Sequence, residues 1–548
     1  MKQFAQKFSA AILILTITVR LFADQTINVD VCVYGGTSGG VIAAVAVAKS
    51  GKSVILIEQG RHLGGLSSGG LGMTDIGNKA VIGGISRDFY KRIGKVYGEA
   101  EAWKFAPSVA EKVFADFVGE NHLRILLDHR ILSAKKSGNH LVSITIEHAP
   151  ADAYNAQVEK GTGEKVIIKA KQFIDAGYEG DLMAAAKVSY TVGREAVSQY
   201  DEPLNGIRGT TPKHQFPTDI KIDPYIKPGD ATSGLLPLVQ EANGGKPGDG
   251  DKRVQAYNFR VCVSSDKANQ TPFIAPPGYD AAKFELLTRY ISAMTTAKKK
   301  MDINTFFKWD IVPGNKTDIN NNGAISTDYI GQSWAYPEAD YATRGKIWHA
   351  TRDYAQGFFY YMATDSHSPD NIRQSLAKWG MPKDEFNDTG GWPHQMYVRE
   401  ARRMVGGYVV TQKVCKHEET AEDSVGMAAY NMDSHNCNRI IKDGSAINEG
   451  DVQVSPSGPY PIAYRAIVPR ESECDNLFVP VCLSATHIAY GSIRMEPVFM
   501  VLGESSAYAA CQAIDEKIAV QKIDVKVLQK KLLDAGQILQ YTQPKKTK

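Results

Sequence analysis

Short apolar runs and a glycine-rich turn alternate near the start of the chain. Residues 29–34 are mostly apolar and β-branched, which is typical of a buried parallel strand. The turn of residues 35–40 (GGTSGG) follows, and residues 41–49 then combine good helix formers with a face of small side chains. A second apolar strand is predicted for residues 54–57, and it ends at Glu58. This order of strand, turn, helix, strand and acid predicts a βαβ unit.

The glycine-rich turn has the chemistry of a dinucleotide-binding loop. Glycines let the backbone approach a pyrophosphate, and the helix N-terminus offers N–H groups and a partial positive charge. Glu58 lies 23 residues after Gly35, close to the roughly 20 expected of an acid that binds ribose hydroxyls. Thr37 departs from the pattern, which has glycine there, and a turn that only packs a helix on a sheet is the alternative. The predicted cofactor contacts in this unit are Gly35, Gly36, Thr37, Ser38, Gly40 and Glu58.

A second glycine-dense loop favours FAD over NAD. Residues 63–72 (LGGLSSGGLG) come soon after Glu58 and would bring backbone along a ligand that extends beyond the ADP half. A flavin ring lies beyond the pyrophosphate in this way. A second dinucleotide fingerprint is absent from the sequence, so no NAD(P) site is predicted. The predicted cofactor contacts in this loop are Gly64, Gly65, Ser68 and Gly69.

Four segments together carry a family resemblance. GGTSGG, LGGLSSGG, DAGYEGDL and SATHIAYGSIRMEP are similar to segments of the FAD-dependent oxidoreductases of the glutathione-reductase-like class. They look most like a secreted bacterial branch related to the fumarate reductase and succinate dehydrogenase flavoproteins. The resemblance covers residues 28–195 and 395–515.

The resemblance implies further cofactor contacts. In this class a strand that enters a glycine turn at DAGYEGDL returns to the ADP part of FAD, although a helix start stabilised by Asp181 is a compatible interpretation. A strand, loop and helix near the C-terminus close the cofactor site, with the helix N-terminus facing the flavin pyrimidine. The implied contacts are Ala176, Gly177, Asp181, Thr486, Ile493, Arg494 and Met495.

The implied FAD is bound non-covalently. In the fumarate reductase relatives, covalent attachment of the flavin occurs close to the position of His62. Alignment by the glycines places Leu63 at that position instead. A leucine side chain cannot form the attachment.

The predicted fold class is α/β, with a discontinuous Rossmann-like FAD-binding domain and an inserted α+β cap or substrate lobe. Residues 24–199 and 395–515 form the two parts of the FAD-binding domain. Residues 200–394 form the cap, because they are rich in Pro, Gly, Asn and aromatic residues and have few long apolar runs. Residues 516–548 are expected to be a basic C-terminal helix and tail.

Periodicity predicts the remaining elements. Helices are expected at residues 84–97, 109–119, 284–298, 342–364, 397–409 and 494–513. Strands are expected at residues 123–127, 253–263 and 477–481, a β-meander at 131–148 and 165–175, and a loop at 484–493.

His487 and Tyr490 are the catalytic candidates of the C-terminal loop. Flavin chemistry needs a group that moves a proton, and this loop is expected to approach the flavin ring. A histidine with a purely structural role is the alternative for His487. Arg494 and Glu496 are secondary candidates in the same segment.

Arg399 is the third catalytic candidate. It falls with Arg402 and Arg403 at i, i+3 and i+4 of a predicted helix, which would place all three on one stripe. Such a stripe is either a solvated face or a means of pointing one arginine into the active site, as in fumarate reductases.

Residues 318–325 match the first eight positions of a calcium loop. The twelfth position requires a bidentate glutamate and holds Tyr329. We therefore predict a polar turn and no metal.

The first 23 residues have the composition of a signal peptide. Lys2 and Lys7 precede an apolar run at residues 8–19, and residues 21–23 offer a cleavage site before Asp24. Twelve apolar residues fall short of the roughly 20 needed to span a bilayer. Export to the periplasm or the extracellular space, with no membrane span in the mature chain, is therefore expected, and an uncleaved anchor is the alternative.

The charge balance and the cysteine content exclude some classes of partner and reaction. Without residues 1–23 the chain has 60 basic and 60 acidic residues, which gives no electrostatic case for nucleic acid. The seven cysteines form no C-x-x-C pair, and an odd number leaves at least one free thiol. The sequence permits one disulfide, either Cys474–Cys482 or Cys415–Cys437, without predicting that it forms. Residues 59–100 contain no cysteine, which excludes the flavin disulfide reductases.

Together these features predict an exported FAD-dependent oxidoreductase. We expect it to oxidise a C–H bond of a small molecule, such as a sugar or glycoside hydroxyl, by hydride transfer to flavin N5. A reductase or dehydrogenase acting on a C=C bond and a flavin electron relay without turnover are the alternatives. The sequence does not specify the electron acceptor or donor.

Overall fold

The computed structural model describes residues 25–209, 211, 213–241 and 243–542. The α-helices are α1 (Ser38–Lys49), α2 (Gly65–Ser68), α3 (Gly84–Tyr97), α4 (Pro107–Glu120), α5 (Asp181–Ala185), α6 (Val197–Tyr200), α7 (Glu285–Thr296), α8 (Tyr341–Thr364), α9 (Asp370–Leu376), α10 (Gln412–Cys415), α11 (His487–Ile493), α12 (Glu496–Glu516) and α13 (Val525–Asp534). The strands are β1 (Gln25–Tyr34), β2 (Val54–Ile57), β3 (Arg124–Leu126), β4 (His129–Ser137), β5 (His140–His148), β6 (Lys165–Asp175), β7 (Tyr190–Thr191), β8 (Gln270–Thr271), β9 (Phe307–Val312), β10 (Lys316–Asn321), β11 (Met381–Pro382), β12 (Arg403–Met404), β13 (Ser424–Ala428), β14 (Met432–Ser434), β15 (Asn438–Lys442), β16 (Ser445–Glu449), β17 (Val452–Val454), β18 (Tyr460–Ala463) and β19 (Leu477–Phe478).

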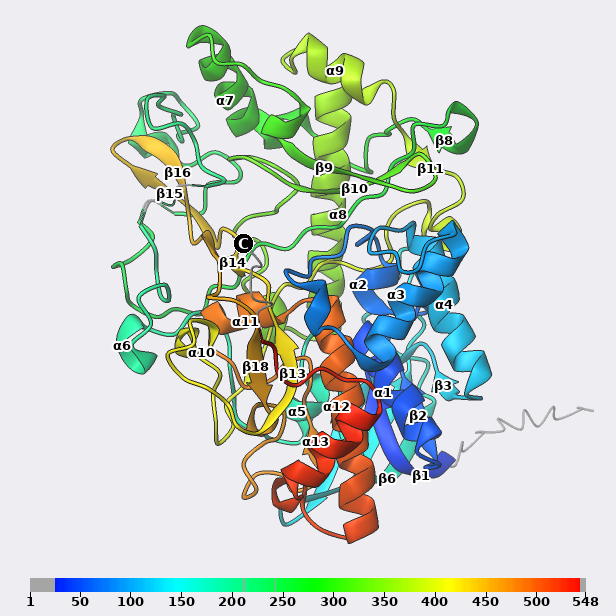
Figure 1. Cartoon of the computed structure of the whole chain (residues 1–548). Coiled ribbons are helices and arrows are strands. Elements are labelled where there is room, and N and C mark those ends of the chain that lie inside the picture. Colours follow the sequence, from blue (N-terminus) through cyan, green and yellow to red (C-terminus); the bar gives the residue numbers. More distant parts are fainter. Residues whose placement is uncertain (1–24, 210, 212, 242, 543–548) are drawn as a thin grey trace, which may run out of the picture.

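One mixed sheet organises the lower half of the molecule as drawn in Figure 1. Within the described residues seven strands form it, in the order β3-β2-β1-β6-β5-β4, and β19 pairs with the end of β6. β3, β2, β1, β6 and β19 are mutually parallel, whereas β4 and β5 form an antiparallel extension. The parallel part is the Rossmann-like arrangement predicted from the sequence, and the extension is the predicted meander.

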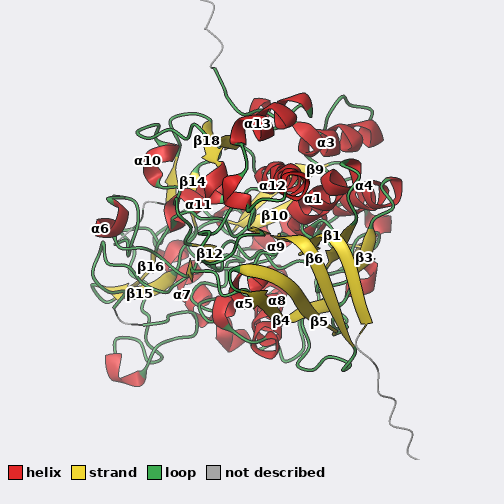
Figure 2. Ribbon diagram, turned by 90° about the horizontal axis from the view of Figure 1, so that it is seen from below, coloured by secondary structure: helices red, strands yellow, loops and turns green. Residues whose placement is uncertain are grey.

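The two faces of this sheet are buried in separate cores. Val31 and Val33 of β1 pack toward α1 and α12, whereas Cys32 and Tyr34 face the core that includes α5 residues. This alternation follows from the two-residue period of a strand, and burial on both faces explains why the run is continuously apolar. Figure 2 shows α1, α3, α4 and α12 gathered on the same side of the sheet.

The inserted segment lies mainly at the opposite end of the molecule. Figure 1 shows α7, α8, α9 and the β9–β10 hairpin above the sheet and its helices. The helices predicted at 284–298 and 342–364 are confirmed as α7 and α8. Aromatic side chains pack between them, for example Phe284 against Tyr354 at a ring-centroid distance of 5.8 Å.

Three predictions of local structure were wrong. Residues 397–409 form no helix and contain only the short strand β12, because their arginines extend in different directions to buried partners. Residues 253–263 are extended but make only isolated bridges, such as Val261 with Ile319. The predicted loop at 484–493 contains α11, whose N-cap Thr486 accepts a hydrogen bond from the N–H of Ala489.

The first half of the segment that resembles a calcium loop, residues 318–321, lies in β10. Asp318 is fully buried and bound by the Arg260 guanidinium at 2.6 and 2.8 Å. Its oxygens therefore satisfy an arginine. The expected polar turn is correct only for the residues that follow Asn321.

Residues 1–23, the predicted signal peptide, lie outside the described residues. Within the described residues no helix is both long enough and apolar enough to cross a bilayer. All seven cysteines are buried and free, so neither of the two disulfides left open by the sequence is present.

Candidate cofactor and active site

The glycine turn between β1 and α1 is built around close backbone approaches. Gly35 has φ of +99°, and a Cβ there would lie 2.4 Å from the backbone nitrogen of Gly177. A Cβ on Gly40 would lie 1.8 Å from the carbonyl oxygen of Gly35. Any side chain at either position would force the turn open. The turn after β6 therefore lies directly against the first turn.

Thr37 stands where the pattern has glycine, and its side chain links the glycine turn to the residue after β6. It is the N-cap of α1, where its Oγ1 accepts a hydrogen bond from the Gly40 N–H at 3.2 Å. The same hydroxyl donates to the carbonyl oxygen of Ala176 at 2.8 Å. The departure from the pattern thus caps the helix and ties both turns together.

Glu58 stands at the tip of β2, as predicted. Its carboxylate accepts hydrogen bonds from the backbone N–H groups of Gly36 at 2.6 Å and Gly60 at 2.7 Å. Burial raises the pKa of Glu58 to about 7, although both N–H groups act in the opposite direction. The acid is held rigidly beside the glycine turn.

Three narrow cavities are lined by predicted cofactor residues, and neighbouring cavities share lining residues. The first, of about 20 Å³, is lined by the glycine turn and includes Gly35, Thr37, Glu58, Gly65 and Gly177. The second, also about 20 Å³, shares Glu58, Gln59, Glu179 and Gln395 with the first. The third, about 10 Å³, shares Tyr178 with the first and includes Arg399, Arg494 and Glu496.

Polar atoms along these cavities fit a dinucleotide. The amide oxygens of Gln59 and Gln157 line the second cavity, and they are buried without a hydrogen-bond partner. Both can accept hydrogen bonds from adenosine hydroxyl or amino groups. At the third cavity, Nε of Arg494 is likewise buried and unpaired. The donor and acceptor set, with the glycine cradle, fits FAD.

Glu496 occupies the first turn of α12, beside the third cavity. Its carboxylate accepts hydrogen bonds from Ser38 Oγ at 2.5 Å, Tyr178 hydroxyl at 2.7 Å and Ser67 Oγ at 3.4 Å. Burial raises its pKa to about 7 despite these donors. Glu496 thereby joins α12, α1 and the second glycine loop.

Several predicted cofactor residues have side chains engaged elsewhere. Asp181 binds Arg344 and Arg402, Thr486 donates to Glu202, and Ser68 donates to the carbonyl oxygen of Leu63. The backbones of Gly64 and Gly69 lie against the side chains of Phe114 and Gln395, where a Cβ would clash. Ile493 ends α11 and Met495 is the N-cap of α12, and both are buried.

His487 is buried with both ring nitrogens engaged. Nδ1 lies 2.8 Å from Glu400 and Nε2 lies 3.0 Å from Ser434 Oγ. Tyr490, on the same helix α11, is also buried, and its ring lies 6.5 Å from that of Phe499. Neither residue lines one of the three cavities.

Arg399 does line the third cavity, and it leads to a cluster that the sequence interpretation missed. Arg399 lies 3.0 Å from Asp328, whose other oxygen is 2.7 Å from His435 Nδ1. His435 Nε2 lies 3.5 Å from Asp433, which is 3.2 Å from Arg494. The cluster is therefore joined to the cavity through two arginines.

The electrostatics of this cluster make His435 easier to protonate than a free histidine. Burial and Arg399 oppose protonation of His435, but Asp328 and Asp433 outweigh them and raise its pKa above 6.5. Burial likewise opposes ionisation of Asp433, yet His435 and Arg494 hold its pKa well below the usual range. No local pattern at residues 432–435 (MDSH) announces this role, because the partners lie in distant segments.

A glycine turn after the first strand of the parallel part of the sheet, an acid after the second strand and a helix N-terminus at the far end define an α/β dinucleotide-binding protein. The chain belongs to the FAD dependent oxidoreductase family, whose model matches residues 30–532. It is an FAD-dependent oxidoreductase, and FAD is its cofactor.

Some solved structures are similar to this chain over about a third of its length. They include L-proline dehydrogenase from P. horikoshii (18% identity, covering 32% of this chain and 25% of that chain, TM-score 0.18). A flavoprotein/dehydrogenase from Cytophaga hutchinsonii (18%, 30% and 42%, TM-score 0.21) and 3-ketosteroid-Δ4-(5α)-dehydrogenase from Rhodococcus jostii RHA1 (13%, 31% and 50%, TM-score 0.20) are others. The chain thus spans half or less of the length of each, and these low scores add nothing to the family assignment. No curated protein matches the chain in sequence.

Proposed function

We propose that the enzyme oxidises a C–H bond of a small molecule, such as a sugar or glycoside hydroxyl, with proton transfer by His435. The observation that carries the proposal is the position of His435, held between two carboxylates and joined to the cofactor cavity through Arg494. FAD, when bound, supplies a two-electron acceptor at N5.

The chain's own residues would handle the proton and the substrate charge. A hydroxyl proton released during oxidation would pass to His435 in its neutral form, and Asp433 and Asp328 would then stabilise the imidazolium that forms. His435 is 7% exposed, so solvent is largely excluded there. The guanidinium of Arg494 binds Asp433 on one side and donates to the Tyr397 hydroxyl at 2.6 Å on the other. It is placed to fix the substrate oxygen next to the proton acceptor.

Along the three cavities, we propose that the predicted glycines, Thr37 and Glu58 hold the adenosine diphosphate half. The N-terminus of α12 would face the flavin ring. His487 would then position Ser434 and Glu400 beneath the cluster, and the inserted lobe of residues 200–394 would cover the substrate.

Reduction of a C=C bond is the second candidate. The flanking Asp328 and Asp433 favour it, because they raise the pKa of His435 and so stabilise the protonated imidazole that would donate a proton to the substrate carbon. Arg399 adds a positive charge that would suit a carboxylate on the substrate.

An anaerobic half-reaction separates these candidates. Bleaching of the enzyme-bound flavin by a sugar from a substrate panel supports oxidation of a hydroxyl. Reoxidation of dithionite-reduced enzyme by an enoate supports C=C reduction. A flavin that responds to neither, but only to a protein or quinone partner, contradicts both proposals.

The role of His435 is tested with the substrate found in that screen. We expect His435→Asn to slow flavin reduction or reoxidation about 10²–10⁴-fold while flavin content is retained. His367→Asn, at an exposed histidine on the cap, is the control. Unchanged rates in His435→Asn would remove the histidine from the mechanism.

A further inference from the structure

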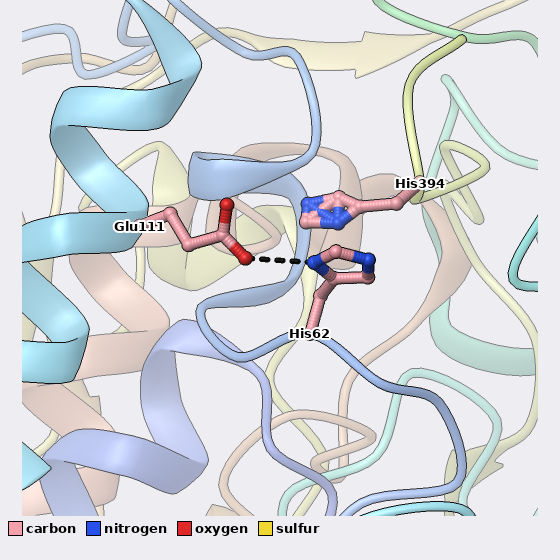
Figure 3. Close-up of side chains that lie close together, drawn as sticks. All are labelled: His62, Glu111 and His394. Carbon is pink, nitrogen blue, oxygen red and sulfur yellow. Dashed lines mark hydrogen bonds and ion pairs between the residues drawn. The ribbon is translucent and has the colours of Figure 1, made fainter. Parts of the chain in front are cut away.

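His62, Glu111 and His394 come together from three separate segments of the chain. His62 lies between β2 and α2, Glu111 lies on α4, and His394 lies before β12. Figure 3 shows the three side chains converging, with Nδ1 of His62 at 2.7 Å from Glu111 Oε1. The rings of His62 and His394 meet edge to face with centroids 3.9 Å apart. One ligand atom from each residue falls within 4.8 Å of the other two.

His394 is the member that ordinary packing does not explain. Its side chain is 1% exposed, and neither ring nitrogen has a hydrogen-bond partner. Leaving a buried polar group unpaired is destabilising, so such groups usually have a ligand or a structural partner. A simple ion pair between His62 and Glu111 would account for those two residues and would leave His394 without a role.

Asp388 supplies a feature common around metal-binding histidines. Its Oδ2 lies 3.1 Å from Nε2 of His62, the ring nitrogen opposite the one that faces Glu111. Histidines that bind a metal through one nitrogen commonly donate the other N–H to a carboxylate, which fixes the tautomer and the ring orientation. In this structure the contact is electrostatic, because the geometry makes no hydrogen bond at Nε2, and it leaves Nδ1 of His62 as the nitrogen directed at Glu111.

We infer that His62, Glu111 and His394 form a binding site for a divalent transition metal of the zinc class. Two imidazoles and one carboxylate are a ligand set that Zn²⁺ accepts, with a further position left for water. Asp388 acts on the metal indirectly, by orienting His62. This site is independent of the substrate and of the direction of the flavin reaction.

Because of where the site lies, a bound metal would hold separate parts of the fold together. His62 also lines the first cavity, together with Gly35 and Gly65. His394 belongs to the end of the inserted segment, and Glu111 belongs to the helix layer over the sheet. A metal bound by all three would connect the second glycine loop, α4 and the inserted segment beside the first cavity.

Zinc content of the intact FAD-loaded protein tests the inference. The protein is equilibrated with Zn²⁺, dialysed against metal-free buffer, and assayed for zinc and flavin per chain. We expect one zinc per chain in the wild type. Glu111→Gln and His394→Gln should each weaken zinc binding at least tenfold, and Asp388→Asn should weaken it about 10–100-fold.

Matched controls separate loss of a ligand from loss of the fold. Glu120→Gln changes another carboxylate of α4, and His367→Gln changes an exposed histidine of the inserted segment. Both should bind zinc as the wild type does. Flavin content and the thermal midpoint of each variant verify folding, and Glu111 and Asp388 are exposed enough to be replaced without collapse, with side chains 43% and 58% exposed.

Two results would overturn the site. One is substoichiometric zinc in the wild type under saturating conditions. The other is equal zinc binding by the wild type and the folded Glu111→Gln variant. Replacement of zinc by Co²⁺ offers an independent check, because cobalt bound to imidazole should give visible absorption that disappears in His394→Gln.

Discussion

Burial and hydrogen bonding have opposite effects on the pKa of the Glu496 carboxyl group. Three hydroxyl donors surround it, yet burial dominates and raises its pKa to about 7. A raised pKa means that the folded protein holds this proton more tightly than the unfolded chain does. The free energy of unfolding should therefore fall as pH rises from about 4.5 to about 7, and the loss should be complete above that range.

We predict that Glu496→Gln flattens this pH dependence. Each proton released on unfolding contributes a slope of about 1.4 kcal/mol per pH unit, and the variant lacks one such proton. Urea unfolding of the FAD-free protein at several pH values between 5 and 8 measures the slope. Glu99→Gln, at an exposed position, is the control, and identical slopes for Glu496→Gln and wild type would contradict the prediction.

His435 shows the limit of reasoning residue by residue. In the sequence it is one of 12 histidines and belongs to no recognised motif. Its charge depends on Asp328, more than 100 residues away, and on the nearby Asp433. His487 stood out because it lies in a recognisable motif, yet both its nitrogens are engaged by Glu400 and Ser434.

Among the elements, α1 and α12 pack unusually closely. A Cβ on Gly503 would lie 2.2 Å from the carbonyl oxygen of Gly39, and a Cβ on Gly39 would lie 2.8 Å from that of Phe499. Small residues at the crossing let two helices from opposite ends of the sequence approach each other. This contact sets the N-terminus of α12 beside the glycine turn, where Glu496 meets Ser38.

We predict that Gly503→Ala destabilises the protein by about 1–3 kcal/mol, because the methyl group overpacks the helix crossing. Flavin affinity should fall as well, since the shift reaches the glycine turn. Gly119→Ala on α4 is the matched control, because nothing lies within 4 Å of a Cβ there. That change should be neutral or stabilising by up to about 1 kcal/mol. Denaturant unfolding compares the two, and equal effects would contradict the prediction.

The arginine segment shows why periodicity can mislead about an element. Arg399, Arg402 and Arg403 have the spacing of a helical stripe, and a helix was predicted. In the structure they bind Asp328, Asp181 and Glu195, which lie in different places. Buried charges require partners, and satisfying three separate partners outweighs helix propensity here.

At the scale of the whole molecule, Asp181 joins the FAD-binding half to the inserted segment. Arg344 of α8 binds both of its oxygens, at 2.7 and 3.0 Å, and Arg402 binds one at 2.7 Å. We predict that Asp181→Asn lowers the free energy of unfolding by about 3–5 kcal/mol, because it leaves the buried guanidinium of Arg344 without a carboxylate partner.

Asp116→Asn is the control for that substitution. Asp116 pairs with Lys112 on the surface of α4, at side-chain exposures of 45% and 70%. A surface pair of this kind contributes about 0–1 kcal/mol. Chemical unfolding measures the free energy of unfolding of both variants. A loss in Asp181→Asn as small as that in Asp116→Asn would show that the ion pairs of Asp181 are not needed for stability.

Export remains a prediction of residues 1–23. Expressed from the full sequence in a bacterium, the protein should accumulate outside the cytoplasm with Asp24 as its first residue, as read by N-terminal sequencing. Leu13→Arg interrupts the apolar run and should leave an unprocessed cytoplasmic chain. An intact N-terminus on exported protein would favour the uncleaved anchor instead.

The sequence by itself determined the βαβ unit and the acid Glu58, whereas the FAD cofactor also required a resemblance to known flavoproteins. These depend on contiguous patterns: apolar runs of strand length, glycines at a tight turn and a fixed spacing to the acid. Only the tertiary structure brought His435 to Asp328 and Asp433, and His394 to His62 and Glu111. Such clusters join segments that are far apart in the chain, and burial in a common core, which no local pattern encodes, decides which of their polar groups meet.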